Sequence, residues 1–222
     1  MKRNVVATMV IVALLAAFVA PVPKARAEAY CNIYVPSRLT IWGPHQSVDV
    51  TYGAGCEQSG TKWAHWQLRS HVTDDVVDHL AYPAQHNFYY FDNVFRLGAF
   101  SVEPTGGGDG SGNPITQNMS RIDIRSGSVA YVSATRSGDH HEVTVRTYHY
   151  SPHYGRIVPT TRYGVLEFRS AGSTTWQGAA LVNTLDGNWT GRTWSPGARE
   201  YRMVFPDAAS VWGVTSAVIQ AD

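Results

Sequence analysis

Alternating apolar and polar residues are the main pattern in this chain, and they indicate β-strands. Side chains on a strand point to opposite faces in turn, so each run has one core face and one solvent face. In residues 64–68, for example, Trp66 and Leu68 share a face. Similar runs occupy residues 38–42, 47–52, 87–91, 99–103, 128–135, 142–148, 165–169, 179–183, 200–205 and 211–219. No sustained helical period follows residue 27, so the sequence predicts an all-β fold.

The number and spacing of these runs also predict how the chain is divided. About seven strands fall in each half, and many short strands at regular spacing are typical of β-sandwiches. We therefore expect two tandem Ig-like β-sandwich domains, at residues 28–120 and 121–222, rather than one sandwich of about 195 residues. Residues 128–135 and 142–148 should form a hairpin across a polar turn that contains Gly138.

A glycine-rich segment interrupts the strand pattern near the end of the first expected domain. Residues 105–114 read TGGGDGSGNP. Such a composition is typical of a flexible loop, and we predict a loop over the whole segment.

The first 27 residues have the composition of a secretory signal peptide. A basic start, Lys2-Arg3, precedes an apolar run over residues 5–20, and Ala25 and Ala27 form an A-x-A cleavage pattern. The apolar run is shorter than the ~20 residues that a membrane-spanning helix needs. The remaining chain has no span of its own, so we expect a protein that is secreted or held at the extracellular cell surface.

Removal of residues 1–27 changes the charge balance and the partners it suggests. It takes away four of the 18 basic residues and none of the 17 acidic ones, which leaves a net charge of −3. A weakly acidic chain without a basic patch is a poor nucleic-acid binder. It also lacks the polybasic stretch that holds proteins to anionic membranes.

Two cysteines, Cys31 and Cys56, are the whole cysteine complement. An even pair in an exported protein favours a disulfide. Its loop of 25 residues would be worth about 3 kcal/mol in the chain-entropy model. The spacing is unlike the C-x-x-C of redox-active pairs, so we expect a structural bridge.

The second half of the chain resembles a known class of module. The residues that carry the likeness are TVRTYHYSP at 144–152, VLEFR at 165–169, STTW at 173–176, DGN at 186–188, REYR at 199–202 and SVWGVTS at 210–216. Over residues 128–220 the chain is similar to the Ig-like or fibronectin-III-like modules of exported proteins from high-GC Gram-positive bacteria. The resemblance implies the fold and an extracellular location, and it implies no activity.

Candidate catalytic and metal-binding groups are few. Residues 74–79 (DDVVDH) could perform acid–base chemistry, but a polar turn that runs into a strand explains them as well. His141-Glu142 lacks the second histidine of a zincin, because position 145 is valine. The histidines at 140, 141, 149 and 153 could together bind a metal ion. The simpler interpretation is that these histidines lie in turns and are exposed to solvent. There is no G-x-S-x-G motif. We expect no cofactor and no enzymatic activity.

Aromatic residues suggest binding instead. Trp189 and Trp194 lie in or beside the predicted turn at 186–188, and Tyr150 and Tyr154 cluster near another turn. Flat rings bury much area at small entropic cost, which suits a surface that binds sugar or protein. We therefore predict a ligand site at these four residues, with a cell-wall polysaccharide or an extracellular protein as partner. The alternative is a secreted hydrolase or protease inhibitor, and the oligomeric state is left open.

Overall fold

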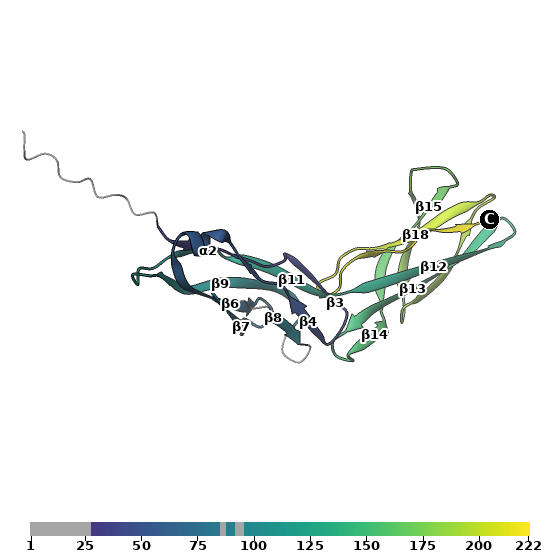
Figure 1. The fold of residues 1–222 in the computed structure, drawn as a ribbon. Helices are drawn as coiled ribbons and strands as arrows, with labels where there is room; N and C mark the ends of the chain where they lie inside the picture. The colour runs from purple at the N-terminus through teal and green to yellow at the C-terminus, as the bar shows by residue number, and fades with distance from the viewer. Residues whose placement is uncertain (1–27, 85–87, 92–95) are drawn as a thin grey trace, which may run out of the picture.

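The computed structural model describes residues 28–84, 88–91 and 96–222 (Figure 1). The predicted signal peptide, residues 1–27, lies outside the described residues. Within them strands dominate and α2 (Ala54–Gln58) is the only helix, so the prediction of an all-β fold is confirmed. No helix in this described part of the chain has the length and apolar composition to cross a membrane.

A five-stranded sheet forms the centre of the N-terminal half. Its order is β3 (Arg38–Ile41), β11 (Ser120–Ser126), β9 (Gly98–Asp109), β6 (Thr61–Ser70) and β7 (Val76–Tyr82). The β3–β11 pair is parallel and the other pairs are antiparallel. The predicted strands at 38–42, 64–68 and 99–103 all lie in this sheet.

Three small strand pairs accompany the large sheet. They are β1 (Tyr30–Cys31) with β10 (Thr116–Gln117), β2 (Ile33–Tyr34) with β5 (Thr51–Tyr52), and β4 (His45–Val48) with β8 (Phe88–Phe91). The single strand predicted at 47–52 is therefore two strands. The chain breaks at Asp49-Val50 because β4 and β5 pair with different partners.

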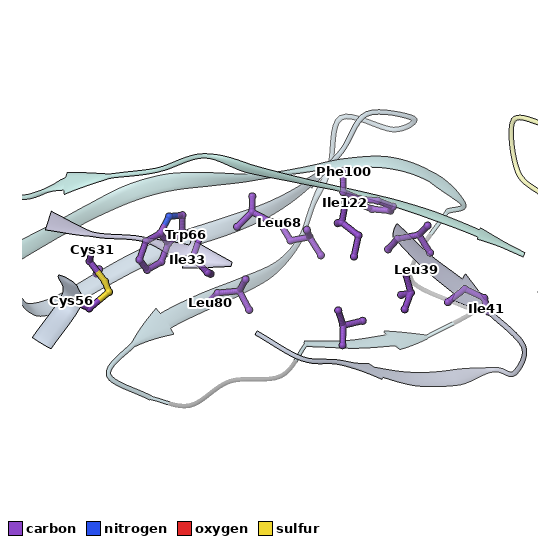
Figure 2. Packing of buried hydrophobic residues seen from close by; sticks show 14 of the residues in the cluster. Cys31, Ile33, Leu39, Ile41, Cys56, Trp66, Leu68, Leu80, Phe100 and Ile122 are labelled. Atoms are coloured by element: carbon purple, nitrogen blue, oxygen red, sulfur yellow. A yellow bond between two sulfur atoms is a disulfide. The ribbon is translucent and has the colours of Figure 1, made fainter. Parts of the chain in front are cut away.

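The core of the N-terminal half lies between the large sheet and the small pairs. Trp66 and Leu68 face inward from β6 as predicted, and Ile33 meets them from β2 (Figure 2). Val48, on β4, belongs to the same cluster of buried residues. Each fully buried large apolar side chain contributes about 1.5–3 kcal/mol relative to exposure. The period-two pattern arises because only one face of each strand enters this core.

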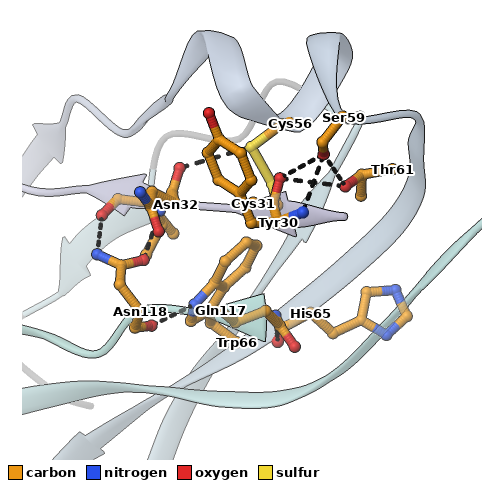
Figure 3. The surroundings of a disulfide bond; sticks show 11 residues. Tyr30, Cys31, Asn32, Cys56, Ser59, Thr61, His65, Trp66, Gln117 and Asn118 are labelled. Atoms are coloured by element: carbon orange, nitrogen blue, oxygen red, sulfur yellow. Dashed lines mark hydrogen bonds between the residues drawn. A yellow bond between two sulfur atoms is a disulfide. The ribbon is translucent and has the colours of Figure 1, made fainter. Parts of the chain in front are cut away.

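A disulfide ties the beginning of the described chain to α2. Cys31 and Cys56 are bonded, which confirms the predicted pairing (Figure 3). The Asn118 side chain holds the next strand, β2, because its amide donates to the Ile33 carbonyl and its oxygen accepts from the Ile33 N–H, each at 2.8 Å. The Trp66 indole donates to the Asn118 carbonyl at 2.9 Å.

The glycine-rich segment is a strand for its first half, so the prediction of a loop over 105–114 is wrong there. β9 continues to Asp109 and pairs with β6 past two register shifts. Glycine is needed because a Cβ at Gly107 would lie 2.7 Å from the Ile115 side chain, and one at Gly108 would lie 2.8 Å from Trp63 Nε1. Close packing, rather than flexibility, accounts for this composition.

The C-terminal half is an Ig-like sandwich. One sheet contains β12 (Ser128–Ser137), β13 (His140–Ser151), β14 (Arg156–Pro159) and β17 (Asn188–Trp194). The other contains β16 (Gln177–Thr184), β15 (Arg162–Ser170), β18 (Arg199–Phe205), β19 (Val214–Thr215) and β20 (Ile219–Ala221). The predicted hairpin is confirmed as β12–β13. The strand predicted at 211–219 is divided into β19 and β20, which pair with opposite ends of β18.

A second hydrophobic cluster fills this sandwich. Val143 and Val145 from one sheet meet Leu166, Tyr201 and Met203 from the other. These residues occupy alternate positions on β13 and β18, as the sequence pattern predicts.

The chain passes from the N-terminal sheets to the sandwich through continuous backbone pairing. β11 belongs to the N-terminal sheet as far as Ser126. Ser126 forms a parallel bridge with Val211, and the Gly127 N–H donates to the Ile41 carbonyl at 2.9 Å. The N-terminal sheets and the C-terminal sandwich lie end to end (Figure 1). The division into domains at residues 120 and 121 stays a prediction.

Trp212 is the main side chain at this junction. Its indole N–H donates to the Leu39 carbonyl at 2.9 Å, and the ring is 6% exposed. The Arg38 and Arg125 guanidinium groups lie 3.5 Å and 4.3 Å from the ring centroid. Cation–π contact of this kind holds side chains of the N-terminal sheets against the sandwich.

Candidate binding surface

The solvent side of β12, β13 and β17 is a flat, regular surface, which we call the outer face. It is aligned by an unbroken antiparallel register, in which Tyr131 lies opposite Arg146, and Arg146 opposite Asn188. All its side chains are exposed or half-buried. They are Tyr131, Ser133, Thr135, Ser137, His140, Glu142, Thr144, Arg146, Tyr148, Asn188, Thr190, Arg192 and Trp194.

Aromatic rings stand at both ends of the outer face. Tyr131 is 60% exposed and meets Tyr148 edge-on, with ring centroids 6.2 Å apart. Trp194, 62% exposed, lies at the other end opposite His140. Six residues of β13 separate these ends, which is about 20 Å at the rise of a strand. An extended ligand could contact both ends at once.

A shallow depression of about 450 Å³ lies beside the tyrosine pair. Its lining includes Ser133, Thr144, Arg146 and the two tyrosines. The Thr144 and Thr190 hydroxyls are 3.3 Å apart, so hydroxyl groups continue across to β17. The surface thus combines ring faces, hydroxyls and a guanidinium, the groups that orient a polar ligand with apolar faces.

The predicted tryptophans divide between the two sides of β17. Trp194 lies on the outer face, whereas Trp189 faces inward, so the two residues do not share a surface. Trp189 is opposite the buried Val145 and its ring lies over Gly191, where a Cβ would be 2.4 Å away. The two residues are five positions apart on one strand, and an odd separation puts them on opposite faces.

The predicted tyrosines also separate. Tyr150 is 2% exposed and packs into the N-terminal core, so its prediction as an exposed ligand residue is corrected. Tyr154 is exposed in the turn between β13 and β14, where its ring meets the His153 ring at 4.6 Å. It lies outside the outer face. Tyr150 turns inward because it lies at the junction between the N-terminal sheets and the sandwich. A local sequence pattern contains no information about that contact.

A buried polar cluster supports the outer face from beneath. The Tyr201 hydroxyl lies 2.9 Å from His141 Nδ1 and 2.9 Å from the Thr193 hydroxyl. Burial, with further contributions from Arg136 and Arg199, lowers the pKa of His141. The Tyr201 hydroxyl on β18 thus links β13, through the neutral His141 imidazole, to β17, through Thr193. His141 is fully buried and has no access to a ligand.

The groups considered for catalysis are engaged elsewhere. Asp74 forms an ion pair with Arg69, and Asp78 accepts a hydrogen bond from the His79 backbone N–H. Hydrogen bonds from Ser101, and then from Gln67 and Arg69, lower the pKa of Glu103 to about 2. Glu103, which sequence reasoning did not select, is therefore ionised at neutral pH and is not suited to donate a proton.

No cluster suited to a metal ion occurs in the part of the chain that the structure describes. There, no three His, Cys, Asp or Glu side chains are gathered closely enough to hold one. His140 and His141 point to opposite sides of β13, exposed and buried respectively, which separates two of the predicted histidines.

Sequence reasoning did not select Tyr131, Arg146, Ser133 or Thr144 as functional residues. The signal was present, because these residues occupy the polar positions of the predicted hairpin strands. A third strand, β17, had not been predicted. Its sequence, NWTGRTW, contains a glycine and few apolar residues, and it therefore lacks a clear alternation.

Comparisons with known proteins add little beyond the fold. No protein-family model and no curated protein matches this chain. Among solved structures, it is similar to the fibronectin(III)-like modules of Clostridium thermocellum CbhA, with 10% identity over 85% of this chain and 91% of that chain, and a TM-score of 0.33. It is also similar to the chicken interferon gamma receptor alpha chain, with 11% identity over 85% and 94% of the two chains and a TM-score of 0.39.

A third similar structure is the D00-D0 domain of intimin, with 12% identity over 86% of this chain and 99% of that chain, and a TM-score of 0.29. At TM-scores below 0.5 these likenesses transfer no ligand and no activity to this chain. The fold and the outer face themselves define an all-β protein with an Ig-like sandwich and an aromatic surface on one of its sheets.

Proposed function

We propose that this chain is an exported, non-enzymatic binding protein that acts at the cell surface or in the medium. The composition of residues 1–27 supports export. The Cys31–Cys56 disulfide supports it independently, because such bonds persist in oxidising compartments outside the cytosol. The module would be of the type found in exported proteins of high-GC Gram-positive bacteria, arranged as two tandem sandwiches.

The observation that carries the proposal is the outer face. It is a regular sheet surface with an exposed ring near each end and hydroxyls between them. Rigid sheet positions require little ordering when a ligand binds, so exposed rings on them are effective contacts.

Cell-wall polysaccharide is the partner that this surface fits best. Sugar rings have apolar faces that stack on tyrosine and tryptophan, and their hydroxyls pair with Ser133, Thr144 and Arg146. A polymer is long enough to contact both ends of the face. A protein partner would be expected to need a larger apolar centre than these polar positions provide.

Co-sedimentation with insoluble cell-wall material tests the proposal. Protein recovered from the exported fraction of an expressing culture should pellet with the wall. The double variant Tyr131→Ala/Trp194→Ala should raise the apparent dissociation constant for the wall at least about tenfold, if stacking contributes roughly 1.4 kcal/mol or more in total.

The matched control is Tyr34→Ala, because Tyr34 is an exposed tyrosine of the N-terminal half, on β2. It should pellet like the unaltered protein. Equal pelleting of the double variant would exclude the outer face as the site. Protein that stays in the supernatant throughout would overturn wall binding.

A further inference from the structure

The strand β16 occupies one edge of its five-stranded sheet. The strand order β16–β15–β18–β19 gives it one partner, β15, and no other described strand pairs with it. An edge strand presents a row of backbone N–H and C=O groups on its free side, and these can pair with another extended chain.

β16 lacks the features that normally protect such an edge. Its sequence, QGAALVNT, contains no charged residue and no proline. A bulge at Ala179 disturbs only its beginning, and residues 180–184 continue in unbroken register with β15. The edge strands of the other large sheets in the described chain each carry a charge: Arg38 on β3, Asp78 on β7, Arg136 on β12, Arg156 on β14 and Arg192 on β17.

Apolar side chains flank this edge on the solvent side of the sheet. Leu181 is 87% exposed and Tyr163, on the neighbouring strand, is 73% exposed. Between them lies a hollow of about 320 Å³, which Val165, Val182 and Pro206 also line. A leucine this exposed contributes no burial energy to its own chain, so its effect on stability there is small.

We propose that β16 pairs with β16 of a second copy of this chain, antiparallel and about a twofold axis. An isologous interface requires one surface that is complementary to itself. β16 meets that requirement because it has no charge to repel its own copy and supplies both the backbone ladder and the apolar flank. The two Leu181 side chains would lie on the same side of the joined sheet and cover the hollows beside Tyr163.

Charged side chains on the solvent side of the neighbouring strands β15 and β18 form ion pairs within the chain. Glu167 pairs with Arg202 at 2.6 Å, and Arg169 pairs with Glu200 on the same solvent side. The surface beside β16 therefore offers no net charge that would select a partner of opposite sign. A second copy provides the extended, uncharged strand that this edge accepts.

Sedimentation equilibrium of the purified protein tests the pairing. Between about 1 μM and 1 mM, the range expected for a modest interface, the mass should rise from that of a monomer to that of a dimer. Leu181→Lys should raise the dissociation constant at least tenfold, because it adds a charge of the same sign to each of the two paired strands and removes an apolar contact.

Leu185→Lys is the matched control. Leu185 is also an exposed leucine, at 67%, but it lies just beyond the end of β16. This variant should associate like the unaltered protein. Hydrogen exchange adds a direct reading of the backbone, since β16 amides on the free side should exchange more slowly as concentration rises.

Two results would overturn the pairing. One is a monomer at every concentration, which would leave this edge to an extended segment of a different protein. The other is a Leu181→Lys variant that keeps its fold, shown by its near-ultraviolet circular dichroism, and still associates with the original dissociation constant.

Discussion

Two histidines on β13 lie where burial disfavours their charged forms. His141 is fully buried beside Tyr201, and His149 is half-buried on the way to the junction. Desolvation is the main cause that lowers the pKa of each, and nearby arginines add to it. Both imidazoles are therefore structural in their neutral form.

Stability should depend on pH through these histidines. Their pKa is lower in the folded chain, so the unfolded chain binds more protons below about pH 6.5, the ordinary pKa of histidine. The free energy of unfolding should be constant above about pH 7 and fall as the pH decreases through about 6.5 toward 5. Urea unfolding at a series of pH values measures this.

The variant His141→Gln should have a shallower pH dependence in that range. Glu103 affects the free energy of unfolding at lower pH than the histidines do, because its pKa of about 2 lies below its usual value of 4.5. Its stabilisation is present above about pH 4.5 and is lost as the pH falls toward 2. A free energy of unfolding that stays flat from pH 8 to 5 would contradict the assignment of the histidines.

At the scale of elements, β17 divides two tasks between its faces. On its inward side, Trp189 packs against the hydrophobic core and the Thr193 hydroxyl forms a hydrogen bond with the Tyr201 hydroxyl. Its outward side carries Trp194 at the edge of the outer face. One strand thus provides both support and a candidate contact, because successive side chains alternate.

Alanine substitutions on β17 should separate these tasks. Trp189→Ala should lower the free energy of unfolding by about 1–3 kcal/mol, less than for a fully buried tryptophan. Trp194→Ala should change it by less than about 0.5 kcal/mol, as is usual for exposed side chains. Guanidinium unfolding curves provide the comparison, and a Trp194→Ala variant that is the less stable of the two would contradict the orientation of β17.

At the scale of the whole molecule, Trp212 joins the N-terminal sheets to the sandwich. The indole bonds to the Leu39 carbonyl, and guanidinium groups from β3 and β11 lie over the ring. Ser128 and Arg162 both donate to the Trp212 carbonyl, so its backbone is also held by the sandwich. One residue thus contacts both parts of the chain.

Trp212→Ala should allow the two parts to move relative to each other. Small-angle X-ray scattering should show a broader distribution of interatomic distances, because the ring that holds Arg38 and Arg125 is gone. Trp176→Ala is the matched control, since Trp176 also lies near two guanidinium groups, those of Arg169 and Arg202, but within the sandwich alone. If both variants gave the same scattering, Trp212 would not be the residue that holds the two parts of the chain together.

The sequence by itself determined the strand content, the β12–β13 hairpin and the pairing of the cysteines. Period-two alternation reports directly which side of a strand is buried, as at Trp66 and Leu68. With two cysteines in the chain, one intramolecular pairing is available. These features depend on local pattern or on simple counting, so no knowledge of distant contacts is needed.

Only the tertiary structure decided which strands meet and what each face contacts. Gly107 and Gly108 belong to a strand because Ile115 and Trp63 pack against them, although their composition alone is that of a loop. Tyr150 is buried because the N-terminal core reaches it at the junction. Trp189 and Trp194 separate because β17 pairs with β13. Such contacts join residues far apart in the chain, and a local pattern carries no information about them.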